Sequence, residues 1–345
     1  MVHYSIKSEA QELCVNQDTL TICFMGDMMM HTEQINKAKR GNSYDFSSYF
    51  ELIQDKISSA DIAVANMEFT HAGEPYSGYP QFSAPDSYSE YLANVGFDVF
   101  LAANNHIFDK RSKGAQRTLE LFKNLEESHG IKVTGLAENE EDSQRRNPLI
   151  INNKGISVAL INFTYGTNLG YDELWPKTNY QGQKKAIASW VEKAEKTADI
   201  TIALPHWGLE YQLTHSEDQE ATAVWLIDKG VDAIIGSHPH VVQDTATIKS
   251  VQVAYSLGNA VSNMSAANTQ VELMATMRIV KDREGKCKIL PIEYTWLWCS
   301  RPGGFRDNYT VIPIEQYIDS KDQWLGQWEY DKMINTYNRI KYKKQ

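Results

Sequence analysis

The sequence predicts an α/β fold built from layers of strands and helices. Short apolar segments rich in β-branched residues alternate along the chain with longer segments whose apolar residues recur at helical spacing. Most of the short segments are bounded by Gly, Asn or Pro, which is typical of buried strands. Strands that alternate with helices favour a layered α/β arrangement. The chain has 345 residues, of which 42% are apolar, so it can bury a core of useful size.

The expected elements follow one another in this alternating order. Strands are expected over residues 19–25, 61–66, 97–103, 156–163, 200–205, 231–236 and 251–256. Helices are expected over residues 112–129, 183–198 and 218–229. Ser216, followed three residues later by Gln219, is a capping-box signal for the last of these helices. Beyond residue 269 the pattern changes to two strands, 271–281 and 287–298, with Gly285 in the turn of a hairpin.

The clearest change in composition comes after residue 298, where the segment SRPGGFRDN is typical of a loop. We therefore expect one domain over residues 1–300 and a Trp-, Tyr- and Lys-rich C-terminal appendage, helical in character, over residues 301–345. Length alone is equally compatible with about two domains or with one large α/β domain. The tryptophans of this region favour core packing over a ligand cage, and they are Trp296, Trp298, Trp324 and Trp328.

Charge and cysteine content exclude several classes of protein. With 34 Lys and Arg against 44 Asp and Glu, the net charge is −10, which argues against nucleic-acid binding and against anionic membranes. A local basic pocket for an anionic substrate stays possible. None of the four cysteines is part of a CxxC pair, so neither a disulfide framework nor a thiolate zinc site is expected. They are Cys14, Cys23, Cys287 and Cys299.

The sequence contains no apolar run of about 18 residues, so no transmembrane helix is expected. The first 20 residues are polar and lack the apolar centre of a signal peptide. We therefore expect a soluble, cytoplasmic protein. A protein whose export signal had been removed would look the same, and a cell-envelope or extracellular location is the alternative.

Residues with metal-ligand chemistry recur where the expected strands end. They are Asp27, Glu68, Asn105, His106, His206, His238 and His240. Open α/β sheets place their ligand sites at this edge. Hard oxygen ligands mixed with imidazoles suit Mn, Fe or Zn. Two such ions, about 3.5–4 Å apart, can hold both the attacking and the leaving oxygen of a displacement, and a carboxylate is the natural bridge between them.

Each of these residues also has an ordinary structural explanation. Asp27 could cap a helix, Glu68 could be a surface carboxylate, and His206 could be a hydrogen-bonded core histidine. The pair His238 and His240 is a stronger signal, because residues i and i+2 of an extended backbone point to the same side. The small residues just before this pair would allow a close approach of the backbone. Seven such residues, nearly all just beyond strands, make coincidence a weak explanation.

Seven sequence blocks, in this order, resemble the CapA family of capsule-synthesis proteins. The blocks are FMGDMMM (24–30), ANMEFT (65–70), AANNHIFD (102–109), FTYGTN (163–168), LPHWGLEY (204–211), GVDAIIGSHPHVVQ (230–243) and YSLGN (255–259). The family is named for poly-γ-glutamate capsule formation and belongs to the calcineurin-like metallophosphatase superfamily. The resemblance covers roughly residues 20–263 and implies a four-layer α/β/β/α sandwich with a metal site along the sheet edges.

The resemblance also implies ligands for two divalent ions. The first ion would be held by Asp27, Glu68 and His240. The second would be held by Glu68, Asn105, His206 and His238. Glu68 stands at the bridging position, and His106 matches a proton-donating histidine, with Asp109 as its orienting partner.

The sequence departs from the superfamily in its first motif. The superfamily has Asp-x-His there, but this chain has Asp27, Met28 and Met29. The first site is therefore expected to bind weakly, to use water, or to recruit His31. Ala260 and Arg111 are lesser departures, which affect the shape of the pocket.

A substrate pocket is expected beside the metals. Its residues would be Thr164, Tyr165, Asn168, Trp207, Glu210 and Asn259. An ordinary polar loop explains residues 163–176 almost as well. The basic residues 110–113 either attract an anion or form a solvated helix start.

Two functional hypotheses follow, and they share every metal residue. The first is a metal-dependent hydrolase linked to poly-γ-glutamate capsule synthesis, which acts on a phosphoester or a γ-glutamyl amide. The alternative is a non-catalytic accessory protein that binds an anionic polymer during capsule export. In both cases the partners would be an anionic small molecule or polymer and the capsule machinery. Family membership predicts the scaffold better than the substrate.

Overall fold

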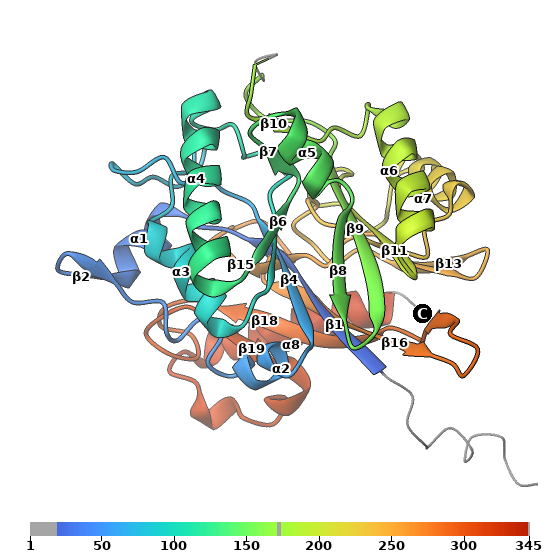
Figure 1. Cartoon of the computed structure of the whole chain (residues 1–345). Coiled ribbons are helices and arrows are strands. Elements are labelled where there is room, and N and C mark those ends of the chain that lie inside the picture. The colour runs from blue at the N-terminus through green and yellow to red at the C-terminus, as the bar shows by residue number, and fades with distance from the viewer. Residues whose placement is uncertain (1–18, 171–173, 344–345) are drawn as a thin grey trace, which may run out of the picture.

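The computed structural model describes residues 19–170 and 174–343, and it confirms the expected four-layer α/β/β/α sandwich. Two β-sheets pack against each other, and helices cover the outer face of each (Figure 1). Residues 1–18, which include Cys14 and the polar N-terminal segment, lie outside the described residues, as do residues 171–173 of the loop 163–176. Among the helices described, none has both the length and the apolar character needed to cross a bilayer.

The first sheet has nine strands and a mixed topology. Its main order is β19-β18-β16-β1-β4-β5-β6, with β15 paired to β1 and β17 paired to β16. β1, β4, β5 and β6 run parallel, whereas β16, β18 and β19 extend the sheet in antiparallel fashion. The strands are β1 (Thr19–Met28), β4 (Ile62–Met67), β5 (Val99–Leu101), β6 (Lys132–Thr134), β15 (Asn259–Val261), β16 (Val271–Lys281), β17 (Cys287–Ile289), β18 (Glu293–Ser300) and β19 (Thr310–Pro313).

The second sheet has six strands in the order β13-β14-β12-β11-β9-β8. Its four central strands are parallel, and the two edge strands are antiparallel to their neighbours. The strands are β8 (Leu149–Asn153), β9 (Ile156–Thr164), β11 (Ile200–His206), β12 (Ala233–Ile235), β13 (Thr245–Ile248) and β14 (Val251–Ala254). All seven strands expected between residues 19 and 256 are present. The later hairpin is present too, with a φ of +85° at Gly285, but its second strand, expected over residues 287–298, is divided into β17 and β18.

Helices cover the two outer faces, as Figure 1 shows. The first sheet is covered by α2 (Gln54–Ser58), α3 (Asp86–Val95) and α4 (Arg111–His129), and the second by α6 (Lys184–Thr197) and α7 (Glu217–Lys229). The capping box of Ser216 and Gln219 is confirmed at the start of α7. Two short helices, α1 (Thr32–Ala38) and α5 (Glu140–Arg146), lie in the connections. The connections also contain two small two-stranded sheets. One pairs β2 (Lys39–Arg40) with β3 (Ser43–Tyr44), and the other pairs β7 (Leu136–Ala137) with β10 (Lys177–Thr178).

The central core lies between the two sheets. Alternate residues of the first sheet, such as Ile22 and Val64, meet residues of the second, such as Leu160 and Ile202, and all four are buried. Both sheets are thus buried on both faces over their parallel strands, which explains why these strands have nearly continuous apolar sequences. The parallel strands of each sheet place their carboxyl ends at one edge of the sandwich.

The C-terminal residues contribute both a strand and a helix. β19 extends the first sheet, and two short 3₁₀ helices, Ile314–Gln316 and Lys321–Gln323, lead into α8 (Gln327–Lys343). Met333 and Tyr337 of α8 pack into the same cluster as Trp298 of β18. The helix expected in this region is therefore present, while the domain boundary at residue 300 stays a prediction. Trp328 is 62% exposed and does not pack in the core.

Candidate metal centre

The candidate ligands converge where the parallel strands of the two sheets end. Asp27 is near the end of β1, Glu68 directly follows β4, His206 is the last residue of β11, and His238 and His240 follow β12. These residues, together with Asn105, are almost completely buried. The two sheets meet here directly, because the backbone amide of His238 lies 3.3 Å from Asp27 Oδ2 and donates a hydrogen bond to it.

The ligands form two groups that share one carboxylate. Asp27, Glu68 and His240 offer ligand atoms within 4.8 Å of one another, and so do Glu68, His206 and His238. His240 Nε2 and His206 Nε2 each lie 3.7 Å from Glu68 Oε1. Asn105 Oδ1 adjoins the second group, 2.8 Å from His206 Nε2. The six residues assigned to metals by resemblance are therefore brought together, with Glu68 between the two groups.

The chemistry of this cluster fits divalent cations. Both carboxylate oxygens of Glu68 and the Nδ1 of His238 are buried and have no hydrogen-bond partner among the described residues. Burial, and after it repulsion from Asp27, raises the pKa of Glu68 well above its usual value. Burial and the neighbouring imidazoles lower the pKa values of His206 and His238, which keeps these rings neutral and able to act as ligands. A cation would remove both the repulsion and the missing contacts.

The backbone around His238 and His240 differs from the extended segment expected. Both residues have positive φ, 100° for His238 and 59° for His240, so the expectation that extended geometry aligns them is wrong. Their rings still face a common space, with centroids 5.8 Å apart. Non-glycine residues in this region of φ are strained, and such strain is concentrated at functional sites. Gly236 allows the close packing here, since a Cβ would lie 2.2 Å from the carbonyl oxygen of Tyr255.

Asparagines that sequence reasoning missed, or assigned otherwise, hold the ligands in place. Asn66 donates to Asp27 Oδ1 over 2.7 Å, and its Nδ2 lies 3.1 Å from His206 Nδ1. Asn259, expected to bind substrate, instead contacts His240, with 2.9 Å between Oδ1 and Nδ1. Asn259 is fully buried and is not among the residues that line the cavity described below, so we expect it to orient the ring of His240. The place of Asn66 at the end of the strand expected over residues 61–66 was the one available signal for it.

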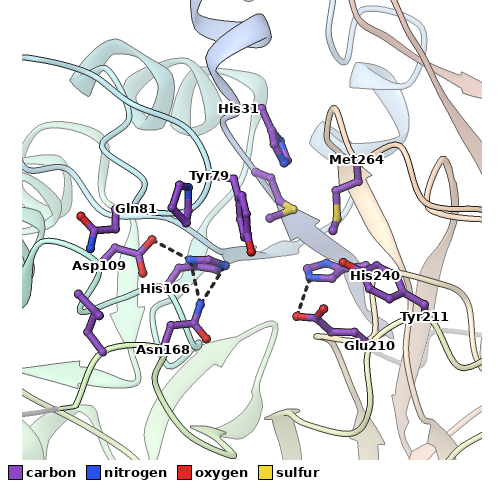
Figure 2. A pocket seen from close by; sticks show the side chains of 13 residues that line it. His31, Tyr79, Gln81, His106, Asp109, Asn168, Glu210, Tyr211, His240 and Met264 are labelled. Atoms are coloured by element: carbon purple, nitrogen blue, oxygen red, sulfur yellow. Dashed lines mark hydrogen bonds and ion pairs between the residues drawn. The ribbon is translucent and has the colours of Figure 1, made fainter.

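His106 is held by a second set of contacts beside the ligand groups. Its Nδ1 lies 2.7 Å from Asp109 Oδ2, and that oxygen also accepts the backbone N–H of Phe82 over 2.8 Å. The Nε2 of His106 lies 3.9 Å from Glu68 Oε1. Figure 2 shows Asp109 on one side of the ring and Asn168 on another, with Asn168 Nδ2 3.3 Å from His106 Nδ1. Asp109 thus fixes the ring so that Nε2 faces the metal ligands.

A cavity of about 310 Å³ opens beside His240 and His106 (Figure 2). Of the expected substrate residues, Asn168 and Glu210 line it. Tyr165 is half-exposed and its ring lies against that of His238, with centroids 4.5 Å apart and the two planes tilted by 39°. Thr164 is buried and donates its hydroxyl to the carbonyl oxygen of Gly166, so it shapes the loop.

Two further residues differ from what the sequence suggested. Trp207, expected to bind substrate, is fully buried in the outer core beneath α6 and α7, and its indole donates to the carbonyl oxygen of Tyr255. The side chain of Trp207 therefore packs in the core. His31 lines the cavity but belongs to none of the ligand groups found among the described residues, and its Nδ1 accepts the backbone N–H of Asn263 over 3.2 Å.

Residues 21–264 match the model of a family described as bacterial capsule synthesis protein PGA_cap, which covers most of the chain. The chain belongs to this family. It is 28% identical over 266 residues to the capsule biosynthesis protein CapA of Bacillus anthracis, a match that covers 73% of this chain and 62% of that protein. It is 25% identical over 293 residues to the PGA biosynthesis protein CapA of Bacillus subtilis, a match that covers 81% and 72% of the two chains.

The fold is that of the metallophosphatases. A solved structure described as a putative 5'-nucleotidase from Staphylococcus aureus, in complex with alpha-ketoglutarate, superposes with a TM-score of 0.54. The likeness covers 80% of this chain and 54% of that one at 14% identity, so it concerns the fold alone. The CapA-type capsule family and the metallophosphatase fold, both expected from the sequence blocks, are thereby confirmed.

Proposed function

We propose that this protein is a metal-dependent hydrolase of capsule synthesis, which acts on a phosphoester or a γ-glutamyl amide at a centre of two divalent ions. The observation that carries the proposal is Glu68, fully buried and without a hydrogen-bond partner in the described chain, between two sets of ligands. Asp27 and His240 would complete the first set, and Asn105, His206 and His238 the second. When bound, divalent ions acidify water and stabilise the charge that develops on the substrate.

The residues of the chain would supply proton transfer and positioning. His106 faces Glu68 through Nε2 and is held by Asp109 through Nδ1. Such a histidine can donate its Nε2 proton to a leaving group, while Asp109 maintains the orientation of the ring. Asn168 and Glu210 line the cavity and would contact the substrate.

An accessory role in polymer export is the second candidate, and the rim of the cavity favours it. Tyr79 and Tyr211 are 73% and 41% exposed at the mouth of the cavity. A second cavity of about 650 Å³ shares both tyrosines and contains Arg301. An extended anionic chain could lie across both spaces, with its charge facing this arginine.

Turnover measurements separate the two candidates. The purified protein, stripped of metal and reconstituted with Mn²⁺, is incubated with bis(p-nitrophenyl) phosphate and with γ-glutamyl-p-nitroanilide. The hydrolase proposal expects metal-dependent turnover of one of them and its loss in Glu68→Gln. The accessory proposal expects no turnover but metal-dependent binding of γ-glutamate oligomers. Glu220→Gln, an exposed glutamate on α7, is the matched control.

A further inference from the structure

The carboxylate of Glu210 lies beside the proposed metal ligands, and a residue that only binds substrate would not need this position. Its Oε1 lies 4.0 Å from His240 Nε2, and Figure 2 shows the carboxylate directed at this ring from the loop below it. Glu210, His238 and His240 together offer ligand atoms within 4.8 Å of one another. No lysine or arginine in the described part of the chain forms an ion pair with Glu210.

The backbone fixes this position. The segment that carries Glu210 is joined to the histidine segment by two hydrogen bonds, from Trp207 N to Ser237 O over 3.0 Å and from Tyr211 N to Pro239 O over 2.9 Å. Gly208 makes the turn between them with a φ of +95°. Any side chain at this position would collide with Gln219, which lies 2.5 Å from the site of a Cβ. Glu210 is therefore kept beside His240 by main-chain contacts that do not involve its own side chain.

The first ligand group lacks a ligand on this side. It contains Asp27, Glu68 and His240, whereas the second group has the amide oxygen of Asn105 in addition to its own three residues. The side chain that faces the cavity two residues after Asp27 is Met29, a buried thioether, which is a poor ligand for hard divalent ions. His31 cannot take its place without breaking its contact with the amide of Asn263.

The charges of the cluster point the same way. Asp27, Glu68 and Glu210 all place a carboxylate oxygen within 4.0 Å of a ring nitrogen of His240. Glu210 thus adds negative charge to a cluster that already carries two buried carboxylates. That addition costs free energy in the absence of a cation and is offset when a cation is held between the groups.

We propose that Glu210 is the fourth protein ligand of the first ion, an assignment that rests on the two-ion centre proposed above. A carboxylate is the kind of ligand that Mn²⁺ and Fe²⁺ accept. The side chain of Glu210 is 42% exposed, whereas those of Asp27 and Glu68 are fully buried. The first ion would therefore be bound from the solvent side by a partly exposed carboxylate, and we expect it to exchange faster than the second.

Metal titration tests this assignment without reference to turnover. Metal-free protein is titrated with Mn²⁺, and free Mn²⁺ is followed by electron paramagnetic resonance. In Glu210→Gln and Glu210→Ala the affinity of the protein for the weaker ion should fall at least about 10-fold. Loss of a residue that only supports a ligand already has an effect of this size, and loss of a ligand should have no smaller one. The tighter ion should keep its affinity. Glu217→Gln, an exposed glutamate at the start of α7, should match the wild type.

A compensating variant sharpens the result. Met29→His in the Glu210→Ala background places an imidazole at the cavity face of the first group and should restore the weaker ion. If Glu210→Ala binds two ions as tightly as the wild type, Glu210 is not a metal ligand, although the two-ion centre still stands. Weakened substrate binding in that variant would then make Glu210 a substrate residue. A wild-type protein that binds a single ion would overturn both the assignment and the proposed two-ion centre.

Discussion

Glu68 is the residue on which both ligand groups depend. Two divalent ions held about 3.5–4 Å apart repel each other, and a bridging carboxylate offsets this repulsion. Glu68→Gln keeps the volume of the side chain but removes its charge. We expect a folded protein that loses the weaker ion and binds the stronger one less tightly.

Metal stoichiometry, with circular dichroism as the check of folding, measures this effect. His206→Ala is the comparison, because it should affect mainly the ion of the second group. A folded Glu68→Gln protein with two tightly held ions would rule out the bridging role. The centre would then have to be redrawn around one ion on Asn105, His206 and His238.

His106 should act in proton transfer and not in metal binding. It lies beside the ligands but belongs to none of the groups able to hold a metal in the described chain. His106→Ala should lower kcat by about 10²–10⁴-fold and leave metal content unchanged. Asp109→Asn should lower kcat less and change its pH profile, because the amide no longer fixes the proton on Nδ1. Loss of metal in His106→Ala would show that His106 is a ligand.

Glu272 of β16 is a buried carboxyl behind the centre that the sequence did not single out. One oxygen accepts the amide of Gly26 over 2.7 Å, and the other has no partner among the residues described. Burial raises the pKa of Glu272 well above 4.5, although the Gly26 amide opposes this and Asp27 adds to it. The folded state thus prefers the protonated acid, whose stabilisation is complete below pH 4.5 and is lost as the pH rises toward the raised pKa.

Glu272→Gln should therefore raise the stability of the folded protein at neutral pH. Glutamine can still accept from Gly26 and does not ionise. The Tm of the metal-free variant should exceed that of the wild type by more at pH 8 than at pH 5. Thermal unfolding across this range measures the difference. A constant difference between the two proteins would show that Glu272 does not titrate as proposed.

At the scale of elements, the strand ends were predictable and the loops after them were not. Apolar segments that end in Asp27, Glu68 and His206 locate the centre, because parallel strands end at a common edge. The conformation of the His238 segment was not predictable, since its positive φ values accompany backbone contacts to residues distant in sequence, Asp27, Pro205 and Tyr211. The roles of Asn66 and Asn259 depend on hydrogen bonds between residues distant in sequence, and no local pattern records them.

Close packing of β1 against β15 should make Gly26 irreplaceable. A Cβ at Gly26 would lie 1.9 Å from the carbonyl oxygen of Gly258, which is impossible without separating the two strands. Gly26→Ala should therefore cost at least about 1–3 kcal/mol of stability and weaken metal binding through Asp27. Gly182, which has open space around it, is the control for substitution by alanine. Urea denaturation and metal titration measure both effects, and a wild-type result in both would refute this account.

At the scale of the whole molecule, the order of elements predicted a layered α/β fold but not the pairing of distant strands. Alternating strands and helices do not show that β1 pairs with β15 and β16, more than 200 residues further along the chain. That pairing brings Asn259 and Glu272 to the centre. The resemblance supplied the four layers, because family blocks carry information on tertiary structure that periodicity lacks.

The packing of the C-terminal residues provides a test of the domain boundary at residue 300. Met333, Tyr337 and Ile340 of α8 are at most 2% exposed, and Ile312 of β19 is fully buried in the same cluster. Burial of each such side chain contributes about 1.5–3 kcal/mol, and whole domains are stable by only about 5–15 kcal/mol.

A chain that ends at residue 300 should therefore not fold cooperatively. Its circular dichroism should show no sharp thermal transition, and it should bind no Mn²⁺ at the concentrations that saturate the full chain. Replacement of Trp328, which is exposed on the same helix, by alanine should leave both properties unchanged. A shortened chain that melts cooperatively and holds metal would show instead that residues 301–345 are an appendage to a complete domain.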